Sequence, residues 1–481
     1  ASKPVVSHKV MVRVQPFLLL PLIVVFSAWG SSKALPLYFI PLHLLTFFVT
    51  SMVCHGELAN SRPSPFHLTE FYLWLSVGGV LGGIFNALVA PLVFTSLAEY
   101  PLVLILSCFL RPRLDPNKEI QRERRMDFIF PLILLAILGV LLLAGYLIGY
   151  EFFREFFERS PKWGIVLITI FFSSLGVFLY SFSNRPLRFG FGIGVFMLAF
   201  SFWGGGQNQV LHSERNFFGV VKVENDPKAG LNLLFHGTTL HGAQNLDSSH
   251  RREPLTYYHR TGPLGQIFDA FSYPKSRKRI AVIGLGTGSI ACYAESGQDW
   301  VFYEIDPTVE KIARDPRYFT FLNDCPAKIE VVLGDGRLSL AKASNFQYDL
   351  IIIDAFSSDS IPVHLLTQEA MELYLARLSK DGILAFHISN RYLNLQPVLG
   401  NLAGDAGLIC LVREDKKVSE TEAKGNKTGS IWVVMAHRGD VLEKISGDSR
   451  WQQVQPRPGA RLWTDDFSNV LSVFLWASSK K

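Results

Sequence analysis

The stretch RIAVIGLGTGSIACYAESGQDWVFYEID, from Arg279 to Asp306, decides which fold the second half of the chain is expected to adopt. It opens with Ile280–Ile283, a short apolar run rich in β-branched residues that is typical of a buried parallel strand. Three glycines follow at alternate positions: Gly284, Gly286 and Gly288. Glycines at this place predict a tight turn and let a ligand approach the backbone closely.

A second predicted strand, Trp300–Ile305, carries acids at its carboxyl end. They are Glu304 and Asp306, and a carboxylate in this position can accept hydrogen bonds from ribose hydroxyls. A glycine turn with a purely structural role is the alternative. Because the acids accompany the glycines, the stretch favours a nucleoside site on an open α/β sheet.

Further apolar runs extend this sheet. Five more strands are predicted at Ile329–Leu333, Tyr348–Ile353, Ile383–Ile388, Leu408–Val412 and Ile431–Ala436. Helices are expected between them at Pro307–Ala313 and Leu365–Leu378, so the pattern predicts a doubly wound α/β sheet of seven strands. Upstream, Phe217–Val223 and Leu231–Phe235 predict a small β-hairpin region.

The first 205 residues have a different character. Hydrophobic residues make up 49% of the whole chain and charged residues 18%, and long apolar runs are concentrated in this part. We expect about seven membrane-spanning helices, at Phe17–Trp29, Leu35–Cys54, Leu68–Val93, Phe94–Leu110, Phe128–Tyr150, Trp163–Tyr180 and Phe189–Trp203. An all-helical soluble core is the less favoured alternative, because several charge-free runs approach the roughly 20 residues that cross a bilayer.

The sequence therefore predicts a multi-pass helical membrane domain followed by the sheet domain. The expected divisions are 1–205 for the membrane part, 213–278 for the hairpin region, 279–440 for the nucleoside-binding domain and 441–481 for a C-terminal extension. The net charge of +6 is modest and suits anionic lipid without a nucleic-acid partner. The five cysteines lack metal-ligand spacing, so no metal is expected.

Two arguments about the side of the membrane conflict. The link Arg111–Asp127 carries six arginine and lysine residues, and the positive-inside rule assigns it to the cytoplasm. Three crossings then follow, which would put the sheet domain outside, whereas a nucleoside cofactor made in the cytoplasm requires it inside. Either the rule fails or Phe189–Trp203 does not cross. We expect a protein of the cell membrane with the sheet domain in the cytoplasm.

Acids follow two further strands. Asp335 lies in Gly334–Gly336, where a carboxylate can accept a hydrogen bond from the adenine amino group. Asp354 follows the apolar run Leu350–Ile353, and a carboxylate at the edge of an apolar sheet tends toward a raised pKa, which suits a general base for an amine. Asp359 is near enough in sequence to assist or to bind a substrate ammonium. A turn-capping role for Asp354 is the alternative.

These motifs together resemble those of spermidine synthase, an aminopropyltransferase with the class I S-adenosylmethionine-dependent methyltransferase fold. The matching parts are GLGTG at 284–288, YEID at 303–306, GDG at 334–336 and DAFSSDSIP at 354–362. The resemblance implies that Glu304 holds the ribose, Asp335 the adenine, and that Asp354 is the base. The nucleoside of the donor would be bound by Gln244, Gly284, Gly286, Gly288, Glu304, Asp306, Asp335 and Gly336.

The membrane part shares the resemblance. The segments HGELA at 55–59, LTEFYLW at 68–74 and WTDDFSN at 463–469 are similar to those of fused membrane and spermidine-synthase-like proteins. Spermidine synthases carry Leu-Asp-Gly, with the acid near the donor ammonium, where this chain has Phe235-His236-Gly237. Other acids would then have to pair with cationic groups. The residues expected to bind substrate are His236, Tyr257, Tyr258, Asp465 and Asp466.

Several functions remain open. The first is a membrane-anchored transferase that moves an alkyl group from S-adenosylmethionine, or its decarboxylated form, to a polyamine-type amine. The second is a nucleoside-sensing transporter or regulator without turnover, whose membrane part would work through Asn86 and the glycines at 78–83. A methyltransferase on a membrane-associated acceptor is a further option, and an NAD-dependent oxidoreductase is weaker. Expected partners are a small amine and membrane lipid, and a homodimer is left open.

Overall fold

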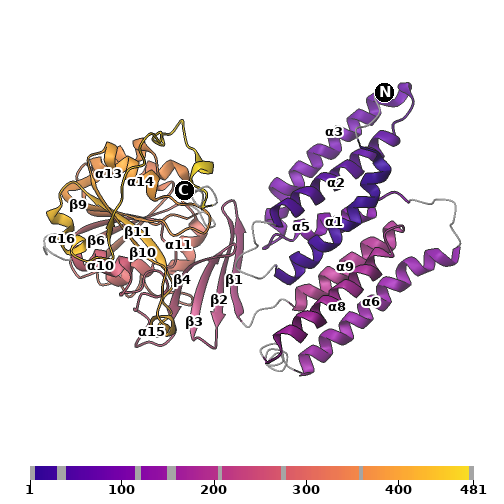
Figure 1. Ribbon diagram of the computed structural model, residues 1–481, viewed down its shortest axis with the longest axis horizontal. Coiled ribbons are helices and arrows are strands. Elements are labelled where there is room, and N and C mark those ends of the chain that lie inside the picture. The colour runs from indigo at the N-terminus through magenta and orange to yellow at the C-terminus, as the bar shows by residue number, and fades with distance from the viewer. Residues whose placement is uncertain are drawn as a thin grey trace. The chain divides into compact units, whose positions relative to one another are not determined.

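The computed structural model describes residues 6–29, 39–113, 121–148, 159–203, 208–271, 278–356 and 361–475. The chain divides into two compact units, Ala1–Gln207 and Asn208–Lys481. The first unit is helical and the second is built on two β-sheets (Figure 1).

All seven apolar segments form helices over the residues that the structure describes. The helices are α1 (His8–Trp29), α2 (Phe39–Asn60), α3 (Leu68–Ile84), α4 (Ala90–Val93), α5 (Glu99–Phe109), α6 (Gln121–Ile148), α8 (Pro161–Tyr180) and α9 (Pro186–Trp203). A π-helical turn, Phe85–Val89, joins α3 to α4, so both belong to one apolar segment. The expected residues 35–38 and 149–150 lie outside the described part of the chain.

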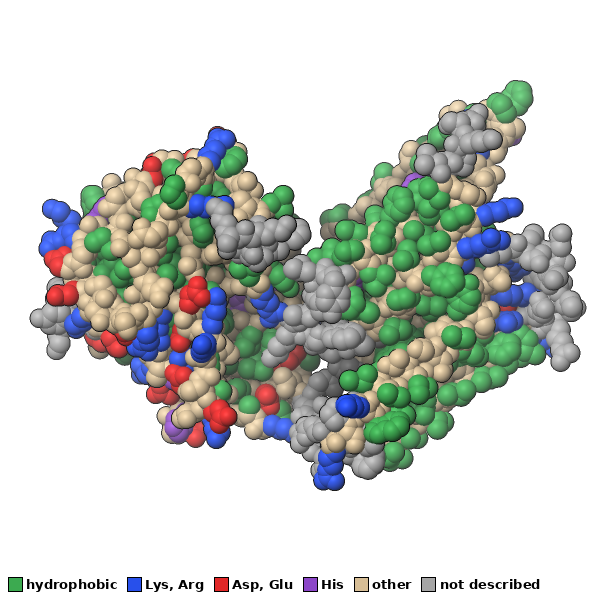
Figure 2. Space-filling view, in the orientation of Figure 1, with side chains coloured by type: hydrophobic (Ala, Val, Ile, Leu, Met, Phe, Trp, Pro, Cys, Tyr) green, Lys and Arg blue, Asp and Glu red, His purple; other side chains and the backbone are tan. Residues whose placement is uncertain are grey.

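Five of these helices are long and apolar enough to cross a membrane, judged by length and composition. The apolar helices Glu99–Phe109 and Pro186–Ser201 are shorter. Large apolar side chains such as Phe47, Leu92 and Leu147 are exposed on this unit. Figure 2 shows such side chains gathered over the helices, which is an unusual surface for a protein part that faces water.

A buried ion cluster fixes the direction of two helices. Asp127, in the first turns of α6, lies 2.7 Å from Arg185 and 3.1 Å from Arg188, which stand at the start of α9. The helices α6 and α9 pack against each other, and their amino-terminal ends lie together, so they run parallel. Because α8 ends at Tyr180 and α9 begins at Pro186, these two form an antiparallel pair.

The second unit begins with a four-stranded antiparallel sheet. Its strands follow one another in the order β1 (Gln209–Asn216), β2 (Gly219–Asp226), β3 (Leu231–His236) and β4 (Thr239–Asn245). The expected hairpin corresponds to β2 and β3, and β1 and β4 extend it on either side.

The large sheet has the strand order β12-β10-β11-β9-β8-β5-β6-β7. Its strands are β5 (Arg279–Ile283), β6 (Asp299–Glu304), β7 (Lys328–Leu333), β8 (Tyr348–Ile353), β9 (Leu378–His387), β10 (Ile409–Asp415), β11 (Ser430–Ala436) and β12 (Gln452–Gln453). The prediction of seven strands is therefore one short. The eighth, β12, is a two-residue polar edge strand that carries no period-2 pattern to recognise.

Alternate residues of β5 enter two separate cores on the two faces of the sheet. Ile280 and Val282 pack in one core, which includes α10 (Pro263–Phe271) and α11 (Pro307–Arg314). Ala281 and Ile283 pack in the other, which includes α13 (Gln368–Arg377) and α14 (Gln396–Asp405). The strand β5 is flanked by β6 on one side and by β8 on the other, so the strand order reverses beside it. Ligands of doubly wound sheets bind at the carboxyl end of the strands at such a reversal.

Candidate active site

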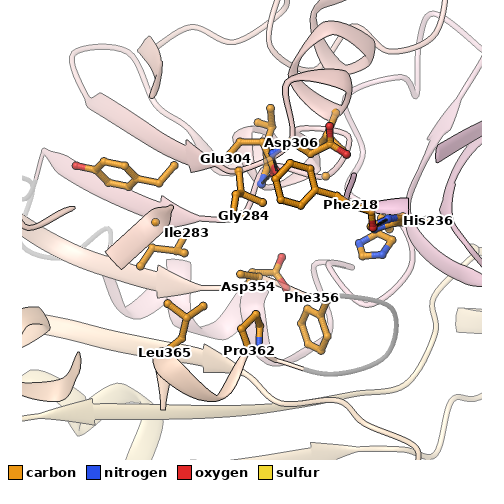
Figure 3. Close-up of a pocket in the computed structure, with 18 of the residues that line it drawn as sticks. Phe218, His236, Ile283, Gly284, Glu304, Asp306, Asp354, Phe356, Pro362 and Leu365 are labelled. Atoms are coloured by element: carbon orange, nitrogen blue, oxygen red, sulfur yellow. Dashed lines mark hydrogen bonds between the residues drawn. The ribbon is translucent and has the colours of Figure 1, made fainter. Parts of the chain in front are cut away.

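A cavity of about 340 Å³ opens at the carboxyl ends of β5, β6, β7 and β8. Residues of the small sheet, including Phe218 and His236, form another part of its wall. Figure 3 shows Glu304 and Gly284 on one side of the cavity, with Asp354 and Phe356 across it. The volume lies in the range of small-molecule sites, and most of the expected residues line it.

The glycine turn after β5 is required by close backbone contacts. Gly284 has φ +102°, and a Cβ there would lie 2.3 Å from the carbonyl oxygen of Asp354. Gly286 has φ +56°, and a Cβ there would lie 2.9 Å from the carbonyl oxygen of His241 on β4. Both glycines line the cavity, whereas Gly288 begins the 3₁₀-helix Ser289–Tyr293 and is not in the lining.

Glu304 is the last residue of β6 and is only 7% exposed. Its two oxygens accept hydrogen bonds from the backbone N–H groups of Leu285 and Asp306, each at 2.9 Å. Burial raises the pKa of Glu304 to about 6 despite these hydrogen bonds. The carboxylate faces the cavity with its orientation fixed by the backbone of two neighbouring turns.

Asp306 has a structural task as well as a place in the lining. One oxygen accepts from Thr308 N at 2.8 Å, capping α11, and from Asn216 Nδ2 at 2.5 Å. The other oxygen, Oδ2, is buried and has no hydrogen-bond partner among the described residues. An acceptor atom is therefore left over beside the cavity.

Asp335 and Gly336 follow β7 and line the cavity beside Glu304. Asp335 caps the short helix α12 (Gly336–Leu340) by accepting from Leu338 N at 2.8 Å. Its second oxygen lies 3.1 Å from Nε2 of His364, a lining residue that the sequence analysis did not single out.

Asp354 follows β8, and each of its two carboxylate oxygens accepts a hydrogen bond from another side chain. Tyr258 donates its hydroxyl to Oδ2 at 2.6 Å, and Nδ1 of His387 lies 2.7 Å from Oδ1. Tyr257 also lines the cavity, and its hydroxyl donates to the carbonyl oxygen of Leu240 at 3.2 Å. The sequence analysis missed His387, although it is the last residue of β9 and a strand-end position could have revealed it.

Two histidines stand in the wall contributed by the small sheet. His236 lies 2.8 Å through Nε2 from the carbonyl oxygen of Phe218, and its ring centroid is 5.7 Å from that of His241. Burial lowers the pKa of His241 to about 4, and its Nε2 has no partner among the described residues. The sequence analysis did not predict His241, because it selected a histidine in this region only where one replaces an acid of the resembled family, at His236.

Besides Gly288, four expected residues lie away from the cavity or outside the described chain. Gln244 is buried against Thr320, whose backbone N–H and hydroxyl it contacts at 2.8 and 2.9 Å. Asp465 forms two hydrogen bonds with Arg337, at 2.7 and 2.8 Å, instead of lining the cavity. Asp466 is exposed and is not part of the lining. Asp359 lies outside the described residues.

The described residues contain no group of three or more histidine, cysteine, aspartate or glutamate side chains that could hold a metal ion. The arrangement instead offers hydrogen-bond acceptors at three strand ends around one cavity. These features define a doubly wound α/β domain with a small-molecule site at the carboxyl ends of its strands.

Comparisons with known proteins agree with this class. No protein-family model matches the chain. Over 188 residues the chain is 31% identical to a polyamine aminopropyltransferase of Vibrio vulnificus, a match that covers 37% of this chain and 59% of that protein. Over 111 residues it is 34% identical to an N-terminal histidine N-methyltransferase of Emericella nidulans, covering 22% of this chain and 19% of that protein.

Solved structures of similar description are found as well. A probable spermidine synthase from Corynebacterium glutamicum has a TM-score of 0.40 at 17% identity, covering 54% of this chain and 97% of its own. Spermidine synthase from Thermotoga maritima has a TM-score of 0.35 at 16% identity, covering 52% of this chain and 81% of its own.

The chain is thus homologous to aminopropyltransferases, with a methyltransferase as a further relative. Both curated relatives are group-transfer enzymes, and the chain spans less than two thirds of the length of each.

Proposed function

We propose that this chain is a membrane-anchored transferase that moves an alkyl group from S-adenosylmethionine, or its decarboxylated form, to an amine. The position of Asp354 carries the proposal. It lies at a strand end, in the same cavity as Glu304 and Asp335, and two donors hold it. A polyamine-type acceptor is favoured by the aminopropyltransferase relative.

The lining residues fit the nucleoside of such a donor. Gly284 and Gly286 line the cavity, and because a Cβ at either would collide with a backbone carbonyl oxygen, only backbone atoms stand at this part of the wall. Glu304 and Asp335 both line the cavity, where Glu304 would accept hydrogen bonds from ribose hydroxyls and Asp335 one from the adenine amino group. The unpartnered Oδ2 of Asp306 supplies one more acceptor.

The reaction needs positioning and one base. The acceptor nitrogen attacks the carbon bonded to the sulfonium sulfur, a carbon–nitrogen bond forms, and the carbon–sulfur bond breaks. The sulfur keeps the bonding electron pair and leaves as a neutral thioether. The proton released by the amine goes to Asp354, whose carboxylate faces the cavity.

The helical unit would hold the enzyme in the cell membrane. Its five long apolar helices and the exposed apolar surface support this part of the proposal. Membrane lipid is then a partner of this unit, and the sheet unit faces the cytoplasm, where the donor is made. We further propose a small amine as the substrate partner, and size measurements on the purified chain test for a homodimer.

Mass spectrometry of the thioether product tests the proposal. The purified full chain is incubated with either donor and with diamines, polyamines or a membrane extract. We expect Asp354→Asn to lower turnover by roughly 10²- to 10⁴-fold, because the amine loses its base. Asp440→Asn, which alters an exposed carboxylate paired with Arg438, serves as the control and should keep full turnover. Absence of product with every combination, or an unchanged Asp354→Asn variant, would contradict the proposal.

Methyl transfer is the second candidate, and it is favoured because His236 stands where the resembled family has an acid. The resemblance puts the donor ammonium near His236, where a decarboxylated donor would need a carboxylate partner, and burial lowers the pKa of His241. The same assay separates the two, because methyl transfer yields S-adenosylhomocysteine and aminopropyl transfer yields methylthioadenosine. Calorimetric binding of a donor without any product would support nucleoside sensing instead.

A further inference from the structure

A hydrogen-bonded chain runs behind Asp354, away from the cavity. Oδ1 of Asp354 lies 2.7 Å from Nδ1 of His387, and Nε2 of the same ring lies 2.7 Å from Oγ of Ser389. The side chains of Asp354 and His387 are each only 4% exposed. Neither partner can therefore be replaced by bulk water without moving the surrounding wall.

The far end of the chain is tied to the sheet. Oγ of Ser389 accepts a hydrogen bond from the backbone N–H of Ile431 at 2.8 Å, on β11. An ionised carboxylate has no proton to donate, so the proton in the Asp354–His387 contact belongs to Nδ1. All contacts are satisfied when Nδ1 donates to Asp354 and the Ser389 hydroxyl donates to Nε2.

Aromatic rings on several sides hold the imidazole in place. The ring of His387 stacks on Trp432, with centroids 4.6 Å apart and planes inclined by 11°. Tyr257 lies 4.8 Å from it and Phe356 lies edge-on at 5.0 Å. The imidazole cannot turn without displacing these rings, so the direction of its N–H group is fixed.

We propose that His387 is a positioning residue for Asp354, holding the carboxylate directed toward the acceptor amine through its Nδ1–H group. This inference rests on the proposed transferase function, and it assigns a role to a residue that contacts Asp354 but is not in the cavity lining. Tyr258 donates its hydroxyl to the other carboxylate oxygen. Asp354 is therefore hydrogen-bonded by side chains from two elements, β9 and the segment before α10.

Two substitutions separate this role from simple packing. His387→Asn keeps an amide N–H near the place of Nδ1, whereas His387→Phe keeps a flat ring but removes the donor. The described titratable groups that face Asp354 are Tyr257, Tyr258, His241 and His387. Both substitutions alter His387 and leave the other three side chains in place.

The split between kcat and KM is the decisive measurement. We expect His387→Phe to lower kcat by roughly 10- to 100-fold, with donor KM little changed, because the base is no longer held in place. His387→Asn should restore most of kcat. Equal losses in both variants, or wild-type turnover in His387→Phe, would overturn the inference.

A spectroscopic readout keeps the inference testable if no turnover is found. In ¹⁵N spectra of histidine-labelled full chain, the ring signal lost in His387→Phe should show a protonated Nδ1 and an unprotonated Nε2. The opposite tautomer would overturn the positioning role. Absence of product in the wild-type protein together with the expected tautomer would contradict the proposed function alone.

Discussion

Asp354 and Glu304 are two buried carboxylates of one cavity with different surroundings. Asp354 receives a tyrosine hydroxyl and an imidazole N–H, whereas Glu304 receives only backbone N–H groups. Burial is the dominant influence on Glu304 and raises its pKa. Its charge state should therefore change within the pH range in which such an enzyme is assayed.

Donor affinity should depend on pH through Glu304. Ribose hydroxyls donate more strongly to the ionised carboxylate, and the pKa of about 6 means that this form is scarce at pH 5 and dominant at pH 7. Calorimetry should show tighter binding of S-adenosylhomocysteine as the pH rises from 5 to 7. Glu304→Gln should bind weakly with a flat profile, and an undiminished pH dependence in that variant would refute the assignment.

The same raised pKa has a consequence for stability. The folded protein holds the Glu304 proton up to about pH 6, whereas the unfolded chain releases it near its ordinary value of 4.5. The folded state then binds more protons over this interval, so the free energy of unfolding contributed by Glu304 falls as pH rises through it. A bound ligand that donates hydroxyl hydrogen bonds to Glu304 would offset this cost at neutral pH.

Among the elements, the segment WTDD at 463–466 connects the helices α12 and α13 of the sheet unit through Asp465, and we call this connection the Asp465 tie. Asp465 pairs with Arg337 at the start of α12 and accepts from the hydroxyl of Thr367, which caps α13, at 2.9 Å. Arg337 in turn donates to the carbonyl oxygen of His364, a lining residue, at 3.1 Å. The C-terminal segment thereby supports the wall next to Asp335.

Loss of this tie should weaken donor binding more than it destabilises the fold. Asp465 is 45% exposed, so its ion pair contributes only about 0.5–1 kcal/mol to the free energy of unfolding. We expect Asp465→Asn to lower donor affinity several-fold in calorimetry, with a small shift in thermal unfolding. Asp466→Asn, at the exposed neighbouring position, is the control, and equal behaviour of the two variants would contradict this role.

Several elements were predictable because their patterns are local. The strands β5 and β8 appear as apolar runs, and the glycines after β5 mark a turn in the sequence itself. The strand β12 consists of only two polar residues and shows no such pattern. It forms because β10 lies beside it. The tie through Asp465 joins residues 128 positions apart, which no local pattern reveals.

At the scale of the whole molecule, helix direction bears on the side of the membrane. The turn between α8 and α9 contains the exposed Asn184, and α9 then runs to Trp203, just before the sheet unit begins at Asn208. The helix has 18 residues, or about 27 Å at 1.5 Å per residue, which is close to the hydrocarbon thickness.

If α9 crosses, the α8–α9 turn and the sheet unit face opposite sides. We expect Asn184→Cys and Ser446→Cys, each in a background without reactive native cysteines, to be labelled by an impermeant maleimide from opposite faces. Ser446→Cys should react only after permeabilisation if the sheet unit faces the cytoplasm, as proposed from the origin of the donor. Labelling of both positions from one face would show that α9 does not cross.

Local patterns in the sequence specify the apolar helices, seven of the eight strands of the large sheet and the carboxylates at the strand ends, since each depends on neighbours within a few residues. What those carboxylates touch depends on the tertiary structure. His387 reaches Asp354 because β9 lies beside β8, and Asp465 joins Arg337 instead of the cavity. Such contacts arise from strand order and packing, which bring together side chains distant along the chain.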